Sequence, residues 1–445
     1  MSAGAGSRRP PLPPGPYLVV GLARSGAAVA TALAARGERV IAVDRGAPEH
    51  EPLGPAVEVR LGDDGLSALA DVAAVVTSPG VPAEAPVLVA AAARGLPVLG
   101  ELECAWRMVE APVIAVTGTN GKTTTSEMLG HLLRELGTAA AVVGNVGTAY
   151  SSLATPGDAL PAQIVCEISS FQLEWAPAFA PEAAVLLNLG SDHLDRHGTI
   201  AEYHRTKLSL FAHQREGDLA VVPADVPSEI VPGLAERVTF GPGADADMVV
   251  ADAALIWRGT ELIPLSELGA PGPHNALNAA AAAAVVLSRG ADPRKVATGL
   301  ATFVGVPHRL EPVIERGGVL WVNDSKATNV DAAVVAMRSF GERPLHVIVG
   351  GRGKGESYAP LREPLAAYGR RAYVIGEEAG AIAAAIDDVL PVSRCGSLEE
   401  AAALAAREAD SGDVVLLAPA CASQDQFRDF EERGKVFADA ARRSI

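Results

Sequence analysis

A glycine-rich segment with the composition of a phosphate-binding loop lies between an apolar run and a predicted helix. It reads GTNGKTT and begins directly after residues 113–117. Glycines let a backbone curl so that its N–H groups face an anion, and the start of a helix adds partial positive charge. Here Lys122 can reach the terminal phosphates of ATP, and the Thr123 hydroxyl can hold Mg²⁺. The residues predicted to bind the triphosphate are Gly118, Thr119, Asn120, Gly121, Lys122, Thr123 and Thr124.

The spacing of this segment departs from the general P-loop pattern, because Val116 stands where that pattern has its first glycine. The segment still follows a strand and opens a helix, which is what phosphate binding requires. The alternative interpretation is a generic strand–helix turn with a chance Gly-Lys-Thr. We favour the phosphate loop because its context and its composition agree.

Further polar side chains lie downstream of this loop. Glu167 ends an apolar strand, where a carboxylate could bind Mg²⁺ directly or through water, or could be an exposed acid. Asp192 and His193 follow the next apolar strand, and His193 could be a metal ligand, could orient a substrate or could be structural. Lys207 lies on a predicted helix whose periodicity indicates a solvated lysine.

Two asparagines, Asn275 and Asn278, begin the predicted helix 274–288 and share one face of it, one turn apart. Their amides could recognise an adenine edge, and they could equally cap the helix. The spacing alone leaves both interpretations open. The following run 279–287 is read as a buried helix rather than a membrane span.

The elements that position these residues form three blocks, each of which restarts a strand–loop–helix rhythm. The blocks begin near Tyr17, Val113 and His308. Alternating strands and helices predict α/β domains with mostly parallel sheets, which bind ligands at the carboxyl ends of their strands. The polar motifs fall at such ends, which supports the interpretation of a common site.

Length, composition and charge bound the class of protein. A chain of 445 residues is expected to form two to four domains. A net charge of -16 argues against nucleic acid as a partner, because such binding needs a basic surface. The four cysteines are scattered without a C-x-x-C pair, which favours neither zinc nor disulfides and suggests the reducing cytoplasm. Neither a signal peptide nor a membrane span is predicted.

Nine motifs, in the same order along the chain, resemble those of the Mur ligase family of peptidoglycan synthesis. They are GTNGKTT, GNVG, EISSFQLE, DHLDRH, HNALNA, PHRLE, NDSKATN, GGRGKG and PACASQDQFRDFEERG. Three of them, GTNGKTT, DHLDRH and HNALNA, are shared across the wider family, including folylpolyglutamate synthases. SSFQLE, NDSKATN and the ACAS–DQF segment are typical of the member that adds D-glutamate. The resemblance implies ATP-dependent addition of D-glutamate to UDP-N-acetylmuramoyl-L-alanine through an acyl phosphate.

The resemblance also implies an architecture. We expect a flexible tail at 1–16, a Rossmann-like UDP-binding domain at 17–105 and a Rossmann-like amino-acid-binding domain at 306–445. Between them, residues 106–305 would form a P-loop-type ATPase domain with a mostly parallel sheet. Because water must be kept from an acyl phosphate, these domains should close on one another, with hinges near residues 100–110 and 303–308. We expect a cytoplasmic monomer.

Individual roles in nucleotide and metal binding follow from the resemblance. ATP would be bound by the phosphate loop together with Asn278, Arg309 and Asp324. Thr123 and Glu167 would hold one Mg²⁺, and His193 would hold a second together with a carbamate on Lys207. The residues expected to carry catalysis are Lys122, Glu167, His193 and Lys207.

Two further groups would bind the other substrates. D-Glutamate would contact His193, Thr328, Lys354, Ser423 and Phe430. The UDP-substrate residues would be Gly21, Leu22, Ala23, Arg24, Asp44, Arg45, Ser78, Gly80 and Asn145.

Two departures from the family pattern concern neighbouring positions. NLGSDH replaces NVTEDH while keeping Asp192 and His193, and Arg352 stands where relatives can carry an acid. The first could shift the loop near the metals, and the second could change the charges near D-glutamate.

Three other functions compete with this interpretation. An NAD-dependent oxidoreductase fits poorly, because the first glycine turn has Ala23 at the position of the middle glycine. A related ligase could add another amino acid or act on folate. A nucleotide-binding regulatory module would not need the metal and substrate residues together.

Overall fold

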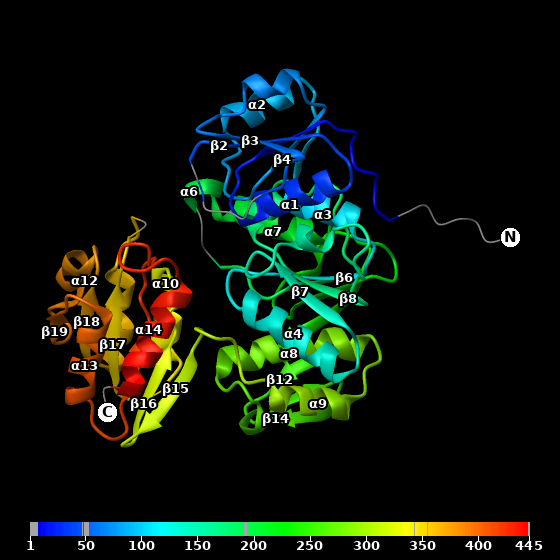
Figure 1. The fold of residues 1–445 in the computed structure, drawn as a ribbon. Helices are drawn as coiled ribbons and strands as arrows, with labels where there is room; N and C mark the ends of the chain where they lie inside the picture. Colours follow the sequence, from blue (N-terminus) through cyan, green and yellow to red (C-terminus); the bar gives the residue numbers. More distant parts are fainter. Residues whose placement is uncertain are drawn as a thin grey trace. The chain divides into compact units, whose positions relative to one another are not determined.

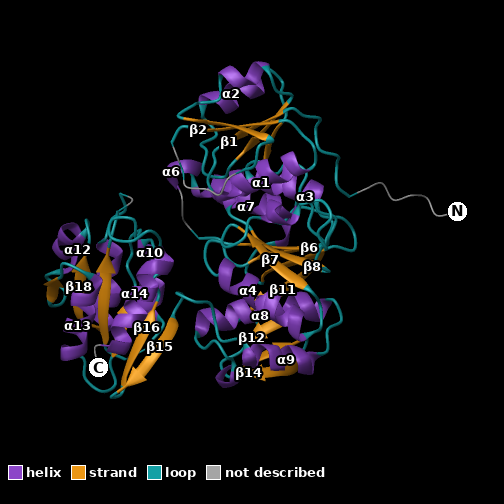
Figure 2. Ribbon diagram, viewed as in Figure 1, coloured by secondary structure: helices purple, strands orange, loops and turns teal. Residues whose placement is uncertain are grey.

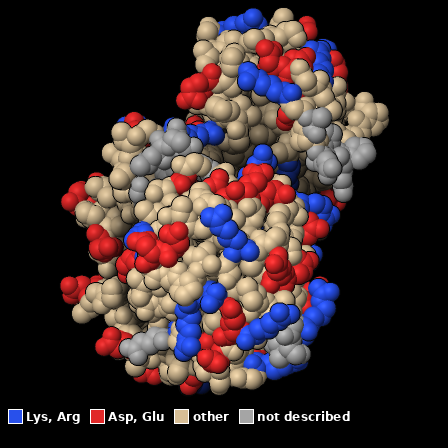
Figure 3. All heavy atoms as spheres, turned by 90° about the vertical axis from the view of Figure 1, so that its left-hand side faces the viewer, with Lys and Arg blue, Asp and Glu red and all other residues tan. Residues whose placement is uncertain are grey.

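The computed structural model describes residues 8–46, 48, 53–190, 194–341, 343–353 and 355–443, and they fold into α/β units (Figure 1). The chain divides into two compact units. The first comprises Met1–Pro271 and Asn275–Phe303, and the second comprises Gly272–His274 and Val304–Ile445. Acidic and basic side chains are interspersed on the face shown in Figure 3.

The first unit begins with a five-stranded parallel sheet in the order β3-β2-β1-β4-β5. Successive residues of β1 point to opposite faces, so that Tyr17 and Val19 join one hydrophobic core and Leu18 and Val20 join another. Strands that are buried on both faces of a sheet appear in the sequence as continuous apolar runs. The elements are β1 (Tyr17–Val20), α1 (Arg24–Ala35), β2 (Val40–Asp44), β3 (Val57–Leu61), η1 (Ser67–Ala70), β4 (Ala74–Thr77), α2 (Pro86–Ala93), β5 (Val98–Gly100) and α3 (Glu101–Met108).

A nine-stranded sheet in the order β14-β13-β12-β11-β10-β9-β6-β8-β7 completes the first unit. Its strands are parallel from β7 to β12, which confirms the mostly parallel prediction, whereas β12, β13 and β14 pair antiparallel. The strands are β6 (Val113–Thr117), β7 (Ala140–Gly144), β8 (Gln163–Glu167), β9 (Ala183–Leu186), β10 (Leu219–Pro223), β11 (Glu236–Gly241), β12 (Met248–Val250), β13 (Ala254–Trp257) and β14 (Thr260–Pro264).

The helices of this second sheet include the alanine-rich α8 (Pro273–Ser288), in which residues 279–285 are fully buried, as predicted for this run. No helix among the described residues is long and apolar enough to cross a membrane. The remaining helices are α4 (Lys122–Glu135), η2 (Tyr150–Leu153), α5 (Ser170–Leu173), α6 (Leu194–His197), α7 (Ile200–Leu208), η3 (Ser209–Phe211), η4 (Ser228–Ile230), η5 (Leu265–Glu267) and α9 (Pro293–Thr302).

The second unit contains a six-stranded sheet in the order β15-β16-β20-β17-β18-β19, in which only the β15–β16 pair is antiparallel. Helices flank this sheet (Figure 2), and Val347 and Ile348 of β17 enter two different hydrophobic cores. The elements are β15 (Glu311–Arg316), β16 (Val319–Asn323), α10 (Val330–Arg338), β17 (Leu345–Gly350), η6 (Ala359–Leu361), α11 (Arg362–Tyr368), β18 (Gly369–Ile375), α12 (Ala379–Ile386), β19 (Val392–Arg394), α13 (Leu398–Glu408), β20 (Val414–Leu417) and α14 (Phe430–Arg443).

The N-terminal segment makes specific contacts with the first unit. Arg8 forms a bidentate ion pair with Asp218, with N···O distances of 2.5 and 3.0 Å. Arg9 donates to the carbonyls of Trp106 and Ala111 and lies over the Trp106 ring. Part of the segment expected to be a flexible tail is therefore anchored.

All four cysteines are buried free thiols, and burial raises the pKa of each one.

Candidate active site

The phosphate loop connects β6 to α4 and depends on glycine at its closest contact. Gly121 has φ of 85°, and a Cβ atom there would lie 2.4 Å from Asn278 Oδ1. On the other side, Asn188 accepts from the Asn120 amide at 2.9 Å and donates to its carbonyl at 3.1 Å. The loop is therefore held between the β9–α6 connection and α8.

Two lysine ammonium groups meet at one carbonyl of this loop. Lys122 Nζ donates to the carbonyls of Gly118 and Thr119, both at 2.8 Å. Lys207 Nζ donates to the same Gly118 oxygen at 2.9 Å and lies 4.4 Å from the centre of the Tyr203 ring. Lys207 is 1% exposed, so its interpretation as a solvated lysine is wrong. Two cations beside a curled backbone provide a strong local attraction for a polyphosphate.

Glu167 is buried at the carboxyl end of β8, beside the phosphate loop. It is 3% exposed, and its Oε1 accepts a hydrogen bond from Asn145 Nδ2 at 3.0 Å. The register pairs Glu167 with Val116 of β6, and Thr123 is buried in the first turn of α4. Asn145, which is predicted to bind substrate, is thus hydrogen-bonded to Glu167, which is predicted to bind metal.

The donors at this edge can be tested against the expected Mg²⁺. The hydroxyl of Thr123 and the carboxylate of Glu167 are hard oxygen ligands that suit such an ion. Lys207, as an ammonium group, has no lone pair to offer, whereas a carbamate would supply oxygens. Asp192 and His193 lie outside the described residues. Within the described part of the chain, no three His, Cys, Asp or Glu side chains gather into a metal site.

The paired asparagines at the start of α8 bind each other and α4. Asn278 accepts from Thr125 Oγ1 at 3.2 Å, and its Nδ2 lies 3.3 Å from Asn275 Oδ1. Asn275 in turn donates to the carbonyl of Pro271 at 3.0 Å. These bonds fix the start of α8 against the helix that carries Lys122.

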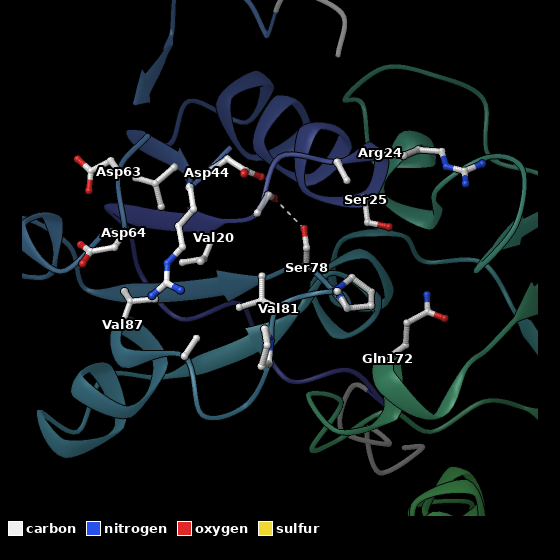
Figure 4. Close-up of a pocket in the computed structure, with 18 of the residues that line it drawn as sticks. Val20, Arg24, Ser25, Asp44, Asp63, Asp64, Ser78, Val81, Val87 and Gln172 are labelled. Carbon is white, nitrogen blue, oxygen red and sulfur yellow. Dashed lines mark hydrogen bonds between the residues drawn. The ribbon is translucent and has the colours of Figure 1, made fainter. Parts of the chain in front are cut away.

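A cavity of about 440 Å³, here called the first-sheet cavity, lies at the carboxyl ends of β1, β2 and β4 (Figure 4). Leu22 is buried beside it and donates its amide to Asp44 Oδ2 at 2.7 Å. Of the predicted UDP-substrate residues, those that line the cavity are Gly21, Ala23, Arg24, Asp44, Arg45, Ser78, Gly80 and Asn145.

Gln172 is one of several residues of this cavity that the sequence analysis missed. Gln172 of α5 lines the cavity together with Asn145, so the second sheet contributes to its wall. Gln172 also completes a capping box, because its Oε1 accepts from the amide of Ser169 at 3.0 Å. Ser-x-x-Gln spacing predicts only the start of a helix. No pattern in the sequence indicates that Gln172 also lines the cavity.

In the second unit, Asp324, Thr328 and Ser423 follow the carboxyl ends of β16 and β20, which are neighbours in the sheet. Asp324 follows β16 and donates its amide to the Leu417 carbonyl of β20 at 2.9 Å. Ser423 is 1% exposed, and its Oγ has no hydrogen-bond partner among the residues that the structure describes. Thr328 follows β16 in the next loop and is half-buried. Lys354 lies outside the described residues.

Asp324 is a buried carboxyl group with an altered acidity. Burial raises its pKa to about 6, while the positive charge of Arg309 acts in the opposite direction. Its Oδ1 accepts the Leu310 amide at 3.3 Å. A carboxyl group with a raised pKa at the end of a strand is typical of functional sites.

Comparison with known proteins gives three matching family models and close relatives. The models are described as "Mur ligase MurD-like, N-terminal domain" (residues 16–100), "Mur ligase middle domain" (116–286) and "Mur ligase, glutamate ligase domain" (308–421). A UDP-N-acetylmuramoylalanine--D-glutamate ligase from Pelotomaculum thermopropionicum is 40% identical, over 95% of this chain and 96% of the relative. Another from Anaeromyxobacter dehalogenans is 41% identical, over 94% and 96%. The chain belongs to the Mur ligase family.

Solved structures show the same fold. The ligase MurC of Thermotoga maritima matches with a TM-score of 0.64 at 20% identity, covering 97% of this chain and all of that one (100%). The MurF ligase of Thermotoga maritima, solved in complex with ADP, gives 0.62 at 21% identity and covers 92% of this chain and 91% of its own. The three-domain α/β prediction is confirmed as the Mur ligase fold, with antiparallel strands added to its second and third sheets.

A buried arginine joins the two predicted D-glutamate loops of this Mur ligase. Arg433 of α14 is 1% exposed and donates to Ser325 Oγ at 3.0 Å and to the Ser325 carbonyl at 2.8 Å. Its remaining nitrogen donates to the carbonyls of Cys421 and Ala422 at 3.1 and 3.2 Å. Burial lowers its pKa to about 10. The sequence places Arg433 in a family motif without indicating this role.

Left-handed backbone conformations occur in this unit of the Mur ligase in the loop before β15 and in the loop after β20. His308 and Leu310, which flank Arg309, have φ of 62° and 44°. Ala420, which precedes the Ser423 loop, has φ of 58°. Such conformations cost free energy for residues with a side chain and concentrate at functional sites. His308 also packs against Phe430, with ring centroids 6.3 Å apart.

Proposed function

We propose that this Mur ligase joins D-glutamate to UDP-N-acetylmuramoyl-L-alanine, with conversion of ATP to ADP and phosphate, in peptidoglycan precursor synthesis. The observation that carries the proposal is the identity of about 40% along almost the whole chain to relatives named as this ligase. The proposal includes a cytoplasmic monomer. It also includes domain bounds of 17–105, 106–305 and 306–445, supported by the three separate sheets.

In the first step, an oxygen of the alanine carboxylate attacks the γ-phosphorus of ATP. The bond from this phosphorus to the β,γ-bridging oxygen breaks, so that ADP leaves and an acyl phosphate forms. Lys122 and the amides of the phosphate loop would stabilise the charge on the transferred group. The hydrogen bonds of Lys122 to the carbonyls of Gly118 and Thr119, which hold its ammonium group at this loop, support this assignment. Asn278, Arg309 and Asp324 would bind the rest of the nucleotide.

Thr123 and Glu167 would hold one Mg²⁺, and His193 with a carbamate on Lys207 would hold a second. The metal ions would neutralise phosphate charge. Asn145 donates to Glu167, which leaves the other carboxylate oxygen to face a ligand. Carbamylation would turn the buried Lys207 cation into an anionic oxygen donor.

In the second step, the amine of D-glutamate attacks the acyl carbonyl. The amide bond forms, phosphate leaves, and the attacking amine gives up one proton to the medium and keeps the other as the amide N–H. The D-glutamate carboxylates would contact His193, Thr328, Lys354 and Ser423, with Phe430 packed beside them. Support comes from the buried Ser423 hydroxyl and from the arginine-linked loops that carry it.

The test is phosphate release by the purified protein with UDP-N-acetylmuramoyl-L-alanine, ATP, Mg²⁺ and a panel of amino acids. We expect release with D-glutamate and little with L-glutamate, glycine or L-alanine. Release of phosphate only with a different amino acid, or no release with any amino acid of the panel, would overturn the assignment. The Lys207→Ala variant should lose activity and regain part of it with short carboxylic acids, which a simple nucleotide-binding module would not do.

A further inference from the structure

Arg196 of α6 reaches from the second sheet to the first within the same compact unit. Its Nη1 donates to the carbonyl of Pro79 at 2.9 Å, and its Nη2 donates to the carbonyl of Val81 at 3.1 Å. Both acceptors belong to the loop that follows β4, here called the β4–α2 loop and comprising residues 78–85. A single guanidinium therefore holds two carbonyls of one loop, which a planar group with five donors can do.

The other side of the guanidinium is fixed by the second sheet. Nη2 of Arg196 lies 2.6 Å from Oε2 of Glu174. Both carboxylate oxygens of Glu174 also accept from Nε of Arg196, each at 3.2 Å. The Phe171 ring lies 4.4 Å from the guanidinium carbon. Arg196 is 15% exposed at its side chain, so water can replace few of these contacts. These contacts with Glu174 and Phe171 thus fix the orientation of the guanidinium independently of the β4–α2 loop.

The β4–α2 loop forms part of the first-sheet cavity. Ser78, Gly80 and Val81 line it, and Ser78 Oγ donates to the Gly21 carbonyl at 2.8 Å (Figure 4). The loop is therefore held by its own sheet at Ser78 and by Arg196 at Pro79 and Val81. Without the second attachment, the cavity wall would lose its support from the domain that binds ATP.

Arg196 therefore connects one wall of the first-sheet cavity to the second sheet. We propose that Arg196 is a positioning residue that holds the β4–α2 loop in the conformation that binds the ligand of this cavity. Filling of the cavity by the uridine nucleotide and attachment of the β4–α2 loop to the second sheet then favour each other. This inference rests on the proposed function for the identity of the ligand.

The test compares Arg196→Lys and Arg196→Ala with a matched control, Arg107→Lys. Arg107 is similarly buried, with 11% of its side chain exposed, and also binds a carboxylate (Glu103) and a backbone carbonyl (Pro11), but these partners lie outside the β4–α2 loop. We measure the Kd of UDP by calorimetry, the KM of all three substrates, kcat and the unfolding midpoint. Lysine can keep the charge but not the fork of donors.

We expect Arg196→Lys to raise the KM of the UDP substrate and the Kd of UDP by about tenfold, as for loss of one charge-assisted hydrogen bond. The kcat and the KM of ATP should each change by less than about threefold, within the usual scatter of distant substitutions. Guanidinium ion at millimolar concentration should restore part of the activity of Arg196→Ala. Arg107→Lys should leave both KM values and the Kd of UDP unchanged.

Several outcomes would overturn the inference. An unchanged Kd and KM for the uridine ligands in Arg196→Lys would do so, as would equal rises in the KM of all substrates. If Arg196→Ala does not fold, Glu174→Gln provides the second measurement, and it must weaken UDP binding in the same direction. Failure of the proposed function is distinguishable, because wild type would then release no phosphate with D-glutamate whatever the variants bind.

Discussion

The carboxyl group of Asp324 combines deep burial with a proposed role as an acceptor for the nucleotide. Its pKa is raised from 3.8 to about 6, so the folded protein binds this proton more tightly than the unfolded chain does. The stability from this difference is fully present below pH 3.8 and is lost as the pH rises through 6. A shift of this size corresponds to a free energy on the order of 3 kcal/mol.

Asp324→Asn should therefore remove a pH dependence in two measurements. In urea unfolding, wild type should gain stability relative to the variant between pH 7.5 and pH 5, because the buried charge is neutralised. In kinetics, the KM of ATP for wild type should rise as the pH falls below 6, because the ionised acceptor is lost. A wild-type KM for ATP that stays flat between pH 7.5 and 5 would contradict the nucleotide role of Asp324.

The left-handed Ala420 offers a test of local strain. A non-glycine residue at φ of 58° is disfavoured, by about 1 kcal/mol or more. Ala420→Gly should raise the free energy of unfolding by up to about 1 kcal/mol, less the greater chain entropy of glycine. Chemical denaturation measures the change, and Ala418→Gly, at a neighbouring buried alanine outside the left-handed set, is the control that should lower stability. Equal losses in both variants would show that Ala420 is unstrained.

At the residue scale, the sequence was informative where the residues of one functional motif are adjacent in the chain. GTNGKTT carries its own mechanism, and its position between β6 and α4 is as predicted. Arg196 and Arg433 are different, because their acceptors are largely backbone carbonyls. Pro79 is 117 residues from Arg196, and Ser325 is 108 residues from Arg433. A backbone carbonyl acceptor cannot be recognised from the residue type, so only the structure reveals the hydrogen bonds of these two arginines.

Among the elements, α14 serves as the support for both proposed D-glutamate loops through Arg433. Arg433→Met should leave four backbone and hydroxyl contacts without their donor and lower the free energy of unfolding by about 3 kcal/mol or more. Arg433→Lys should retain part of that stability, and in both variants the KM of D-glutamate should rise more than that of ATP. Calorimetry and phosphate release measure these effects.

Arg428 is the matched control for this prediction. It lies just before α14 and pairs with Glu432 of that helix, but 79% of its side chain is exposed. An exposed ion pair contributes little, so Arg428→Met should scarcely change stability. A similar loss of stability in the two methionine variants would mean that Arg433 has no special supporting role.

Strand prediction also depended on burial. The apolar runs of β1, β6, β8 and β9 are covered on both faces and were found from the sequence. The β13–β14 hairpin was not, because its strands are only partly buried. Its turn uses Arg258 and Gly259, both with positive φ, in place of the Asn-Gly or Asp-Gly pair that marks such hairpins.

On the scale of the whole molecule, the N-terminal segment adds to stability through Arg8. Asp218 is 5% exposed at its side chain, and Arg8→Met would leave it without its cationic partner. We expect a loss of about 1–3 kcal/mol in the free energy of unfolding. Arg60→Met, which removes an exposed pair with Glu58, should have little effect. If Arg8→Met is as stable as wild type, the segment is not a structural part of the fold.

The burial of all four thiols has a practical consequence for labelling chemistry. Reagents attack the thiolate, and each native cysteine is both inaccessible and poorly ionised. The folded wild-type chain should therefore react slowly with maleimides. Exposed positions such as Glu84 and Glu399 can then carry a single introduced cysteine each, and a dye will attach there without removal of any native residue.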